Sequence, residues 1–542
     1  MLEAGLLTLF VESLGRALFV SHEWLGKSHP DPDSRQLKVL QDALKNIMSG
    51  RSRVGLPIVT EMYYGRLPCP TAADLKSKPL FIWYDYLCVP QGSSPDAIKN
   101  RQHAINSIPS YVARCEYFVI LCPELQHMDQ PRILSQSSWA DRGWCRTERL
   151  ARELAARDDG FMIVVSSPVH QSLVFDMNRC LEAPGLGKFT FEADRKKVGN
   201  VIVQMVWNKL HHHLARGDLH KYRFLLNSQS TRCLQNLDVD PIDGLVPGFH
   251  SDENPFTDPK AFLLDWFMHQ NGFKSYTDYD SGGWSPLCFA VMRGNTALVQ
   301  SLLDRHASPN DATQKPKKEM VFGRNLSVLS IAAIYNSNEV MHVLLEARAN
   351  VNARDSHYGT PLHWANISNN SEGVRILCQA AADPNVRCFP GLTPFETACA
   401  CSAISAMREM LAQIPSTSLK RSLHWALMFH GGSTDTVRFL IDARANVDER
   451  FDVSVKEPTW WLLLTGASMK HRVSPSNFTS LAYHRRGATP LMFSILSGYF
   501  EAAAVLLAAG ARFGVQNSRR KTAADLARDS LAPSLLLTRM GK

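Results

Sequence analysis

The sequence lacks a run of residues long and apolar enough to cross a membrane. The apolar stretch near its start covers only residues 5–11 and is bounded by Glu3 and Glu12. No basic region precedes it, so we expect no secretory leader. No block of six like charges is present, and 59 Lys and Arg against 51 Asp and Glu leave a net charge of only +8 in 542 residues. We therefore expect neither a membrane span nor a nucleic-acid partner.

Cysteine pairs of the kind that bind zinc are also absent. The 12 cysteines include no Cys-x-x-Cys pair, and the closest two, Cys399 and Cys401, have no histidines at zinc-ligand spacing. We therefore expect no metal site and reduced thiols. Reduced thiols favour a cytoplasmic location, with the nucleus left open.

The composition that remains is that of a soluble globular protein, with 45% hydrophobic and 20% charged residues. At about 150 residues per domain, a chain of this length holds three or four domains, or one domain and a repeat array. The search for internal repeats decides between these two arrangements.

One motif recurs in the C-terminal half at a fixed interval. Thr360 begins Thr-Pro-Leu-His and Thr393 begins Thr-Pro-Phe-Glu 33 residues later, and Thr489 and Thr522 repeat that interval. A hydroxyl residue before Pro caps a helix, and Pro fits the first helical turn. Motif and period resemble the ankyrin repeat. The resemblance implies an all-α solenoid in which each unit buries its apolar face only against its neighbours.

The repeat region is expected to span residues 281–531. We place repeats at residues 282–314, 325–357, 358–390, 391–419, 420–450 and 487–519, with a cap at 520–530. The extra residues around 315–320 predict a lengthened hairpin finger. Residues 451–486 fit either a decayed repeat or a long insertion, and the sequence leaves both open.

Ankyrin arrays bind proteins through their hairpin tips and concave helix face, so the resemblance implies a protein partner. The candidate contact residues at the tips are Arg354, His357, Tyr358, Arg387, Phe389, Arg450 and Arg519. Arginine and aromatic residues are enriched in interfaces. The alternative for any one of them is a solvated finger residue without a partner.

Residues 1–190 alternate strand-like and helix-like segments. The apolar runs at 18–21, 79–85, 117–122 and 161–165 predict strands buried on both faces, with amphipathic helices between them. This order predicts a three-layer α/β fold around a parallel sheet, with ligands at the carboxyl ends of the strands. Ser21, His22 and Asp85 stand at two of these ends.

The same region carries two family resemblances. Residues 19–21, 118–121 and the Gly-Trp-Cys-Arg-Thr-Glu segment at 143–148 resemble a Toll/interleukin-1 receptor (TIR) domain, which has a flavodoxin-like fold. Residues 83–91, Trp-Tyr-Asp-Tyr-Leu-Cys-Val-Pro-Gln, are similar to fungal heterokaryon-incompatibility (HET) domains. The TIR resemblance implies NAD as a possible substrate and Glu148 as the catalytic residue, and TIR relatives assemble, which implies self-association. Ser21, His22, Asp85 and Trp144 are the candidate cofactor-binding residues.

A salt-bridged helix face is the competing explanation for Glu148. Arg149 with Glu153, and Glu148 with Arg152, have the spacing of helical i, i+4 ion pairs. Two functions therefore stand side by side. The favoured one is an ankyrin scaffold for protein interaction and signalling with a TIR-like effector or assembly domain, and the alternative is an NAD hydrolase regulated by the array.

Residues 191–280 are expected to link the two halves. Residues 193–226 predict a helix, 238–259 are rich in Asp, Pro and Gly, and 261–272 predict a helix that packs on the first repeat as a lead-in cap.

Overall fold

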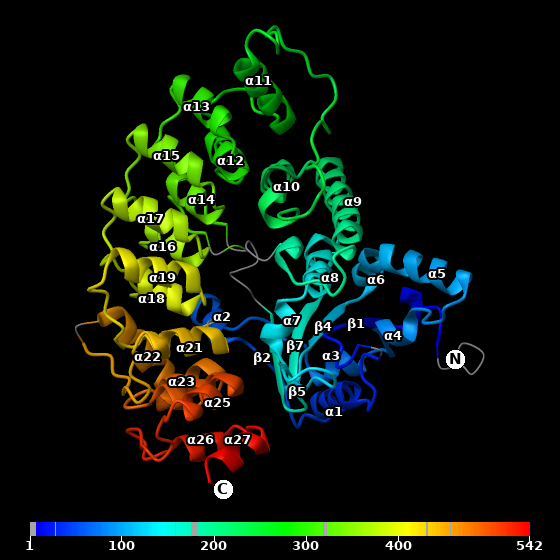
Figure 1. Cartoon of the computed structure of the whole chain (residues 1–542), viewed down its shortest axis with the longest axis vertical. Coiled ribbons are helices and arrows are strands. Elements are labelled where there is room, and N and C mark those ends of the chain that lie inside the picture. The colour runs from blue at the N-terminus through cyan, green and yellow to red at the C-terminus, as the bar shows by residue number, and fades with distance from the viewer. Residues whose placement is uncertain are drawn as a thin grey trace. The chain divides into compact units, whose positions relative to one another are not determined.

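A computed structural model of the chain describes residues 7–27, 29–157, 159–174, 183–317, 320, 322–429, 432–455 and 457–541 (Figure 1). These residues form two compact units. The first contains residues 7–174, 183–217 and 229–242, and the second contains 218–228 and 243–541. Each unit is described by itself below.

A six-stranded sheet forms the centre of the first unit. Its strands are β1 (Arg16–His22), β2 (Val54–Gly55), β3 (Leu80–Tyr84), β4 (Tyr117–Leu121), β7 (Phe161–Ser167) and β8 (His170–Leu173), in the order β2-β8-β7-β4-β1-β3. The four longest apolar runs became β1, β3, β4 and β7, which pair in parallel. A second, two-stranded sheet joins β5 (Leu125–Gln126) to β6 (Ile133–Leu134).

The sheet is mixed, which corrects the expectation of an all-parallel sheet. Strand β8 pairs with β7 in antiparallel fashion, and β2 joins the edge through β8. Only Pro168 and Val169 separate β7 from β8. A connection this short can join only antiparallel strands, because a parallel crossover needs about a dozen residues.

Helices cover both faces of the sheet. On one face α1 (Arg35–Ser49) and α3 (Ala72–Lys76) share a core with Leu18, Val20 and Val119. On the other face α6 (Ile108–Arg114) and α8 (Gly143–Leu154) pack on β1. Here Phe19 stacks between Trp83 and Phe118, at ring distances of 4.4 and 5.4 Å. The remaining helices before the linker are α2 (Ile58–Tyr64), α4 (Asp85–Cys88), α5 (Pro95–Asn106) and α7 (Gln136–Ala140).

The segment expected to be one helix over 193–226 is two helices. Helix α9 (Asp194–Ala215) packs on α8 in the first unit, and α10 (Leu219–Arg232) follows. The break falls at Gly217, whose φ of +66° lies in the left-handed region that glycine adopts without strain. Helix α11 (Pro259–Asn271) packs on the second helix of the first repeat, as expected of a lead-in cap.

The second unit is built from helix pairs joined by hairpin fingers. The pairs are α12/α13 (Pro286–Arg293, Thr296–Asp304), α14/α15 (Val328–Ile334, Asn338–Glu346), α16/α17 (Pro361–Ile367, Ser371–Gln379), α18/α19 (Pro394–Ala400, Ile404–Gln413), α20/α21 (Ser422–Met428, Thr434–Asp442), α22/α23 (Pro458–Lys470, Asn477–His484), α24/α25 (Pro490–Ser497, Phe500–Ala508) and α26/α27 (Ala523–Asp529, Ser534–Arg539). The hydroxyls of Ser285, Ser327, Thr393, Thr489 and Thr522 each cap a first helix by accepting a backbone N–H. The hydroxyl residue therefore sets where these five pairs begin.

The pair α22/α23 lies outside this stack. First helices pack on first helices along the array, and α20 packs directly on α24. The imidazole of His363 bonds to the carbonyl of Leu392, one residue before the next cap, and His424 bonds in the same way to Ala488 (both 3.1 Å). Because α24 occupies the next place in the stack, residues between Arg450 and Gly487 are an insertion rather than a decayed repeat.

The insertion leaves and rejoins the array at one closed point. The N–H of Phe451 donates to Ala488 O at 2.8 Å, and the N–H of Gly487 donates to Phe451 O at 2.9 Å. Residues 318 and 319 of the lengthened finger expected around 315–320 lie outside the described residues, and Lys317 and Phe322 on either side pair as an antiparallel bridge.

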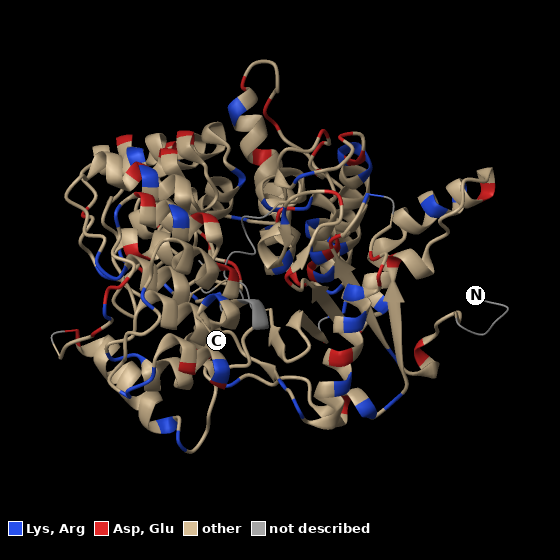
Figure 2. Cartoon of the chain, turned by 60° about the horizontal axis from the view of Figure 1, so that its bottom comes forward, with Lys and Arg blue, Asp and Glu red and all other residues tan. Residues whose placement is uncertain are grey.

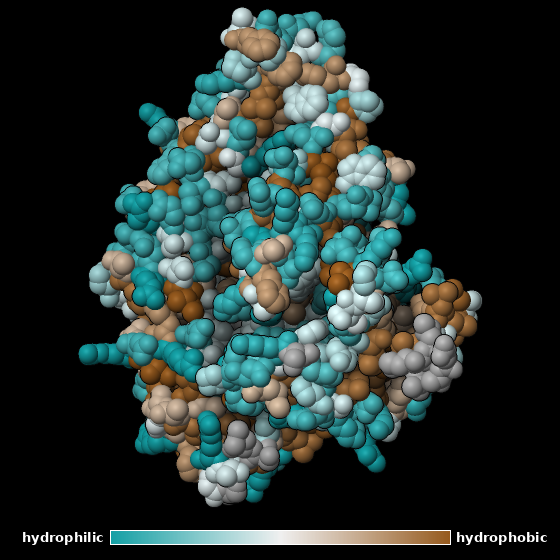
Figure 3. Space-filling view, turned by 45° about the vertical axis from the view of Figure 1, so that its right-hand side comes forward, coloured by the Kyte–Doolittle hydropathy of each residue, from teal (hydrophilic) through white to brown (hydrophobic). Residues whose placement is uncertain are grey.

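Basic and acidic residues are interspersed along the helices and loops of both units (Figure 2). On the face shown in Figure 3, separate apolar patches lie among polar residues. Among the described residues, none of the helices has the length and apolar character that a membrane span requires.

Candidate functional site

A polar cluster lies at the carboxyl ends of the parallel strands of the first unit. Strand β1 ends with Ser21 and His22, and Asp85 follows β3 as the first residue of α4. Glu148 comes from the second turn of α8. Adjacent parallel strands place their carboxyl ends on one edge, which is where open α/β sheets bind ligands.

Ser21 links Glu148 to the body of the sheet. The indole N–H of Trp139 donates to Ser21 Oγ at 3.0 Å, and Ser21 Oγ lies 2.5 Å from Glu148 Oε2. Because an indole nitrogen can only donate, Ser21 accepts from Trp139 and directs its own proton to Glu148. This bond fixes the position of the Glu148 carboxyl group beside the end of β1.

His22 is held between two acceptors. Gln36 Nε2 donates to Glu23 O at 2.8 Å, which turns Gln36 Oε1 toward His22 Nδ1 at 2.7 Å. The other ring nitrogen lies 2.8 Å from Asp85 Oδ1. Both ring nitrogens therefore face oxygen acceptors, an arrangement that suits the doubly protonated imidazolium. The His22 side chain is 1% exposed and the Asp85 side chain is 30% exposed.

The pKa values of these acids are driven apart. Burial, with a further contribution from the negative charge of Asp85, raises the pKa of Glu148 to about 8. Burial would also raise the pKa of Asp85, but His22 and the indole N–H of Trp24 outweigh it and the pKa lies below its usual range. Burial alone would lower the pKa of His22, and Asp85 raises it instead. One carboxyl is thus ionised beside a neighbour that holds its proton near neutral pH.

The structure brings together four of the five residues that the sequence nominated for the N-terminal site: Ser21, His22, Asp85 and Glu148. Trp144 instead donates its indole N–H to Asp194 Oδ2 of α9 at 3.2 Å. The expected ion pair between Arg149 and Glu153 is present at 3.6 Å.

The second expected ion pair, between Glu148 and Arg152, is replaced by other contacts. Arg152 donates to the backbone carbonyls of Cys115 and Asp159, whereas Glu148 bonds to Ser21. A salt-bridged helix face therefore explains Arg149 but does not explain Glu148.

Sequence reasoning missed Gln36 and Trp139. They lie 14 residues from His22 and 118 residues from Ser21 along the chain. Gln36 on a helix and Trp139 before the Gly-Trp-Cys segment carry no signal of their own, because only the fold brings them to β1.

The nominated tip residues of the second unit differ in their surroundings. Tyr358 is 60% exposed at a positive φ of 62°, and Arg354 beside it is exposed. His357 and Phe389 are half-buried, and the finger backbone joins them through the Phe389 N–H and His357 O at 2.7 Å. Arg450 and Arg519 are exposed and lie on the last fingers.

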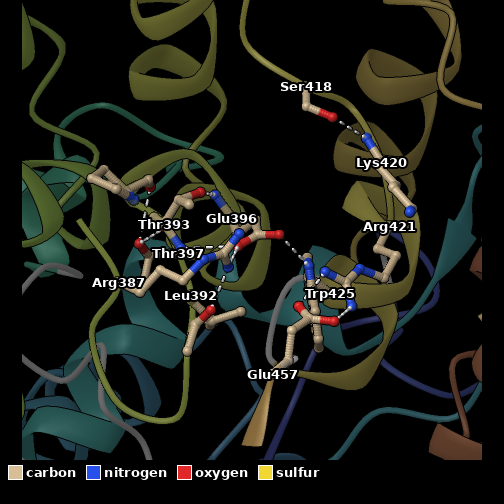
Figure 4. Close-up of polar contacts among 12 residues, drawn as sticks. Arg387, Leu392, Thr393, Glu396, Thr397, Ser418, Lys420, Arg421, Trp425 and Glu457 are labelled. Carbon is tan, nitrogen blue, oxygen red and sulfur yellow. Dashed lines mark hydrogen bonds and ion pairs between the residues drawn. The ribbon is translucent and has the colours of Figure 1, made fainter. Parts of the chain in front are cut away.

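Arg387 belongs to a structural network at the fourth repeat (Figure 4). It donates to Gly391 O at 2.6 Å and pairs with Glu396 at 3.2 Å, and Trp425 donates to the other oxygen of Glu396 at 3.1 Å. Nearby, Arg421 forms two bonds to Glu457 of the insertion, at 2.7 and 3.0 Å. Arg387 therefore holds its finger in place through these two contacts.

Comparison with known proteins assigns the first three helix pairs of the second unit. A family model described as ankyrin repeats, three copies, matches residues 287–388, from α12 to the finger after α17. The C-terminal half carries ankyrin repeats. All of the matched residues belong to the second unit.

Three curated relatives match parts of this chain. Rabankyrin-5 of Mus musculus is 30% identical over 174 residues, 30% of this chain and 14% of its own. The human transient receptor potential cation channel subfamily A member 1 is 26% identical over 34% of this chain and 17% of its own. NF-kappa-B inhibitor alpha of Sus scrofa is 27% identical over 25% of this chain and 44% of its own. The chain thus spans less than a fifth of the first two relatives.

Two solved structures are similar to about half of the chain. The human ASB11 ankyrin repeat domain is 21% identical, with a TM-score of 0.35, over 47% of this chain and 98% of that domain. The ankyrin repeat domain of Bcl-3 is 18% identical, with a TM-score of 0.34, over 48% of this chain and 100% of that domain.

Proposed function

We propose that the protein is an interaction scaffold whose ankyrin array recruits a protein partner to a signalling or assembly domain. The observation that carries this proposal is the unbroken stack of helix pairs, which continues from α20 to α24 past the insertion. An array of this kind presents fingers and a helix face without chemistry of its own. NF-kappa-B inhibitor alpha, one of the relatives, is named for a protein on which it acts.

The first unit is proposed to be the TIR-like or HET-like signalling domain. Its four parallel strands lie side by side in the order β3-β1-β4-β7. If they are numbered 1 to 4 along the chain, this order is 2-1-3-4, as in flavodoxin-like sheets. The proposal includes self-association of this unit and a cytoplasmic location for the protein. Sedimentation of the full chain over a range of concentrations tests self-association, and a monomer throughout would remove it.

A capture experiment tests the scaffold proposal. The full chain is immobilised, incubated with extract of the cells that produce it, and compared with the Arg354→Ala, Tyr358→Ala double variant and with Arg375→Ala as a matched control. Arg375 is an exposed arginine on α17 that pairs with Glu372. We expect a captured protein that the tip variant binds less and the control binds equally. Capture of nothing above empty resin by the wild-type chain would contradict the proposal.

A second candidate function is hydrolysis of NAD in the first unit. It is favoured by the bond between Ser21 and Glu148, at the edge of the sheet where His22 and Asp85 also lie. In this reaction the bond between nicotinamide and the ribose C1′ breaks, and water adds to C1′ to give ADP-ribose. A carboxylate beside C1′ stabilises the positive charge that develops on the sugar, as in glycoside hydrolysis. Glu148 is proposed for that role.

The pKa of Glu148 makes this candidate sharply testable. Since the ionised form is needed and the pKa is about 8, the rate of nicotinamide release should rise as the pH passes from about 6 to about 9. Glu148→Gln should abolish release, and Asp141→Asn, an exposed acid that pairs with Lys188, should leave it unchanged. Equal release by wild type and Glu148→Gln would remove the enzyme function.

A further inference from the structure

The last three fingers of the array are joined side by side by their backbones. Gly487 N–H donates to Phe451 O, and Ser518 N–H donates to Arg486 O, each at 2.9 Å. The side chain of Arg450 reaches across to Gln516 O at 2.6 Å. These bonds hold the tips of the three fingers at fixed positions relative to one another.

Four exposed arginines stand on these tips: Arg450, Arg486, Arg519 and Arg520. We refer to them as the C-terminal arginine cluster. The guanidinium of Arg519 lies over the ring of Tyr483, 4.0 Å from its centroid, which orients its planar fork. An arginine fixed in this way loses less conformational entropy when it binds a carboxylate.

The acids of neighbouring segments have other partners. Asp448 pairs with Arg512, and Asp529 pairs with Lys521, both at 2.7 to 2.8 Å. Within the described part of the chain, no Asp or Glu forms an ion pair with any member of the cluster. The positive charge of the cluster is therefore not neutralised by the chain itself.

Two titratable groups next to the cluster, Arg485 and His484, have lowered pKa values. Burial, followed by the charge of Arg486, lowers the pKa of Arg485, and Arg519 lowers it further against an opposing effect of Asp452. Burial is also the first cause that lowers the pKa of His484 to about 4, and the cations Lys521 and Arg519 contribute. Burial is the largest cause of both shifts, and the charges of Arg486 and Arg519 add to it in the same direction.

We infer that the C-terminal arginine cluster binds an acidic, Asp- and Glu-rich peptide segment of the protein partner. Arginine forks match carboxylates in bidentate geometry, and three aligned fingers fit an extended chain. Four cations are fewer than the six to ten phosphate contacts of a typical nucleic-acid site, and the net charge of the chain is only +8. This inference rests on the proposed scaffold function and names the chemistry of its partner.

The test uses the full chain and a fluorescein-labelled peptide of alternating glutamate and serine, with a glutamine and serine peptide of equal length as reference. The test variant is Arg486→Gln with Arg519→Gln. The matched control is Arg375→Gln with Arg438→Gln, two exposed arginines on α17 and α21 that pair with acids of their own helices. Test and control variants lose the same charge from the same array.

We expect fluorescence anisotropy to show binding of the acidic peptide that weakens with added salt. The test variant should bind at least about fivefold more weakly, because two charge-assisted contacts are lost, while the control variant should match wild type. Far-ultraviolet circular dichroism of both variants checks that the array is folded.

Three results of the binding measurements would each overturn the inference. They are equal affinity of the test variant and wild type, equal affinity of the two peptides, or tighter binding of single-stranded DNA or phosphatidylserine vesicles than of the acidic peptide. If the test variant still captures the partner protein found with the wild-type chain, the acidic-peptide inference fails while the scaffold function stands. If neither chain captures a partner and the acidic peptide does not bind, both fail.

Discussion

Buried histidines are used in opposite ways by the two units. In the array, His363 accepts the Thr360 N–H at Nδ1 and donates from Nε2 to Leu392 O, so the ring is neutral. Burial lowers the pKa of His363 to about 4 and that of His424 to about 3. His22 in the α/β unit is equally buried, yet Asp85 raises its pKa.

The difference teaches that the partner, not the burial, decides the charge of a buried histidine. A carbonyl partner gives a structural link that can recur from repeat to repeat, as it does at His363 and His424. A carboxylate partner gives a charged pair, and the pair of His22 and Asp85 lies where its charge can act on the neighbouring Glu148.

The largest loss of stability is expected from a substitution in the packed core of the array. Trp425 is fully buried and stacks on Trp460 of the insertion at 4.9 Å. Trp425→Ala should lower the free energy of unfolding of the array by roughly 3–5 kcal/mol, because it leaves a large cavity. Hydrogen exchange resolved by segment measures this loss, which should spare residues 16–22 of the sheet. Leu462→Ala, at a side chain that is 63% exposed, should change little, and an equal loss there would contradict the packing described.

The next effect is the acid sensitivity of the array. Histidines whose folded pKa is lowered bind fewer protons folded than unfolded, so stability falls as the pH drops from about 6.5 toward 4. At about pH 5 the loss should be roughly 2 kcal/mol for each of His363 and His424. Replacing both histidines with Gln should flatten the dependence of the free energy of unfolding on pH in this range. Urea unfolding at each pH, followed by hydrogen exchange in α16 and α20, measures this dependence. An unchanged slope would show that these rings are not neutral in the fold.

A smaller effect of opposite sign is expected in the α/β unit. Because the folded pKa of Glu148 is raised, the folded state binds more protons, and stability falls as the pH rises from about 4.5 to about 8. Glu148 is partly exposed, so we expect a loss of roughly 2 kcal/mol over this range, absent in Glu148→Gln. Hydrogen exchange in β1 and β4 at each pH measures this loss of stability. Parallel pH profiles of the two proteins would mean that the Glu148 carboxyl titrates normally.

Much of the array could be predicted from local signals. A capping hydroxyl and a proline act within one helical turn, so Thr393 and Thr489 placed α18 and α24 correctly. The apolar runs of the four parallel strands, and the position of Ser21, His22 and Asp85 at strand ends, follow equally from short segments.

Long-range pairing could not be predicted. The addition of β8 as an antiparallel strand depends on the turn at Pro168, and the bond between Ser21 and Glu148 joins residues 127 apart. The status of residues 451–486 depends on whether α20 meets α22 or α24, which no local pattern specifies. In each case the decisive contact exists only after distant segments have packed.

The two backbone bonds that tie Phe451 to Gly487 and Ala488 make this point of the array a natural acceptor for foreign sequence. A segment grafted there begins and ends at neighbouring positions, so its length places no tension on the helices before and after it. A reporter such as a circularly permuted fluorescent protein could be inserted at the same point. Its fluorescence would then change when a partner binds to the neighbouring fingers.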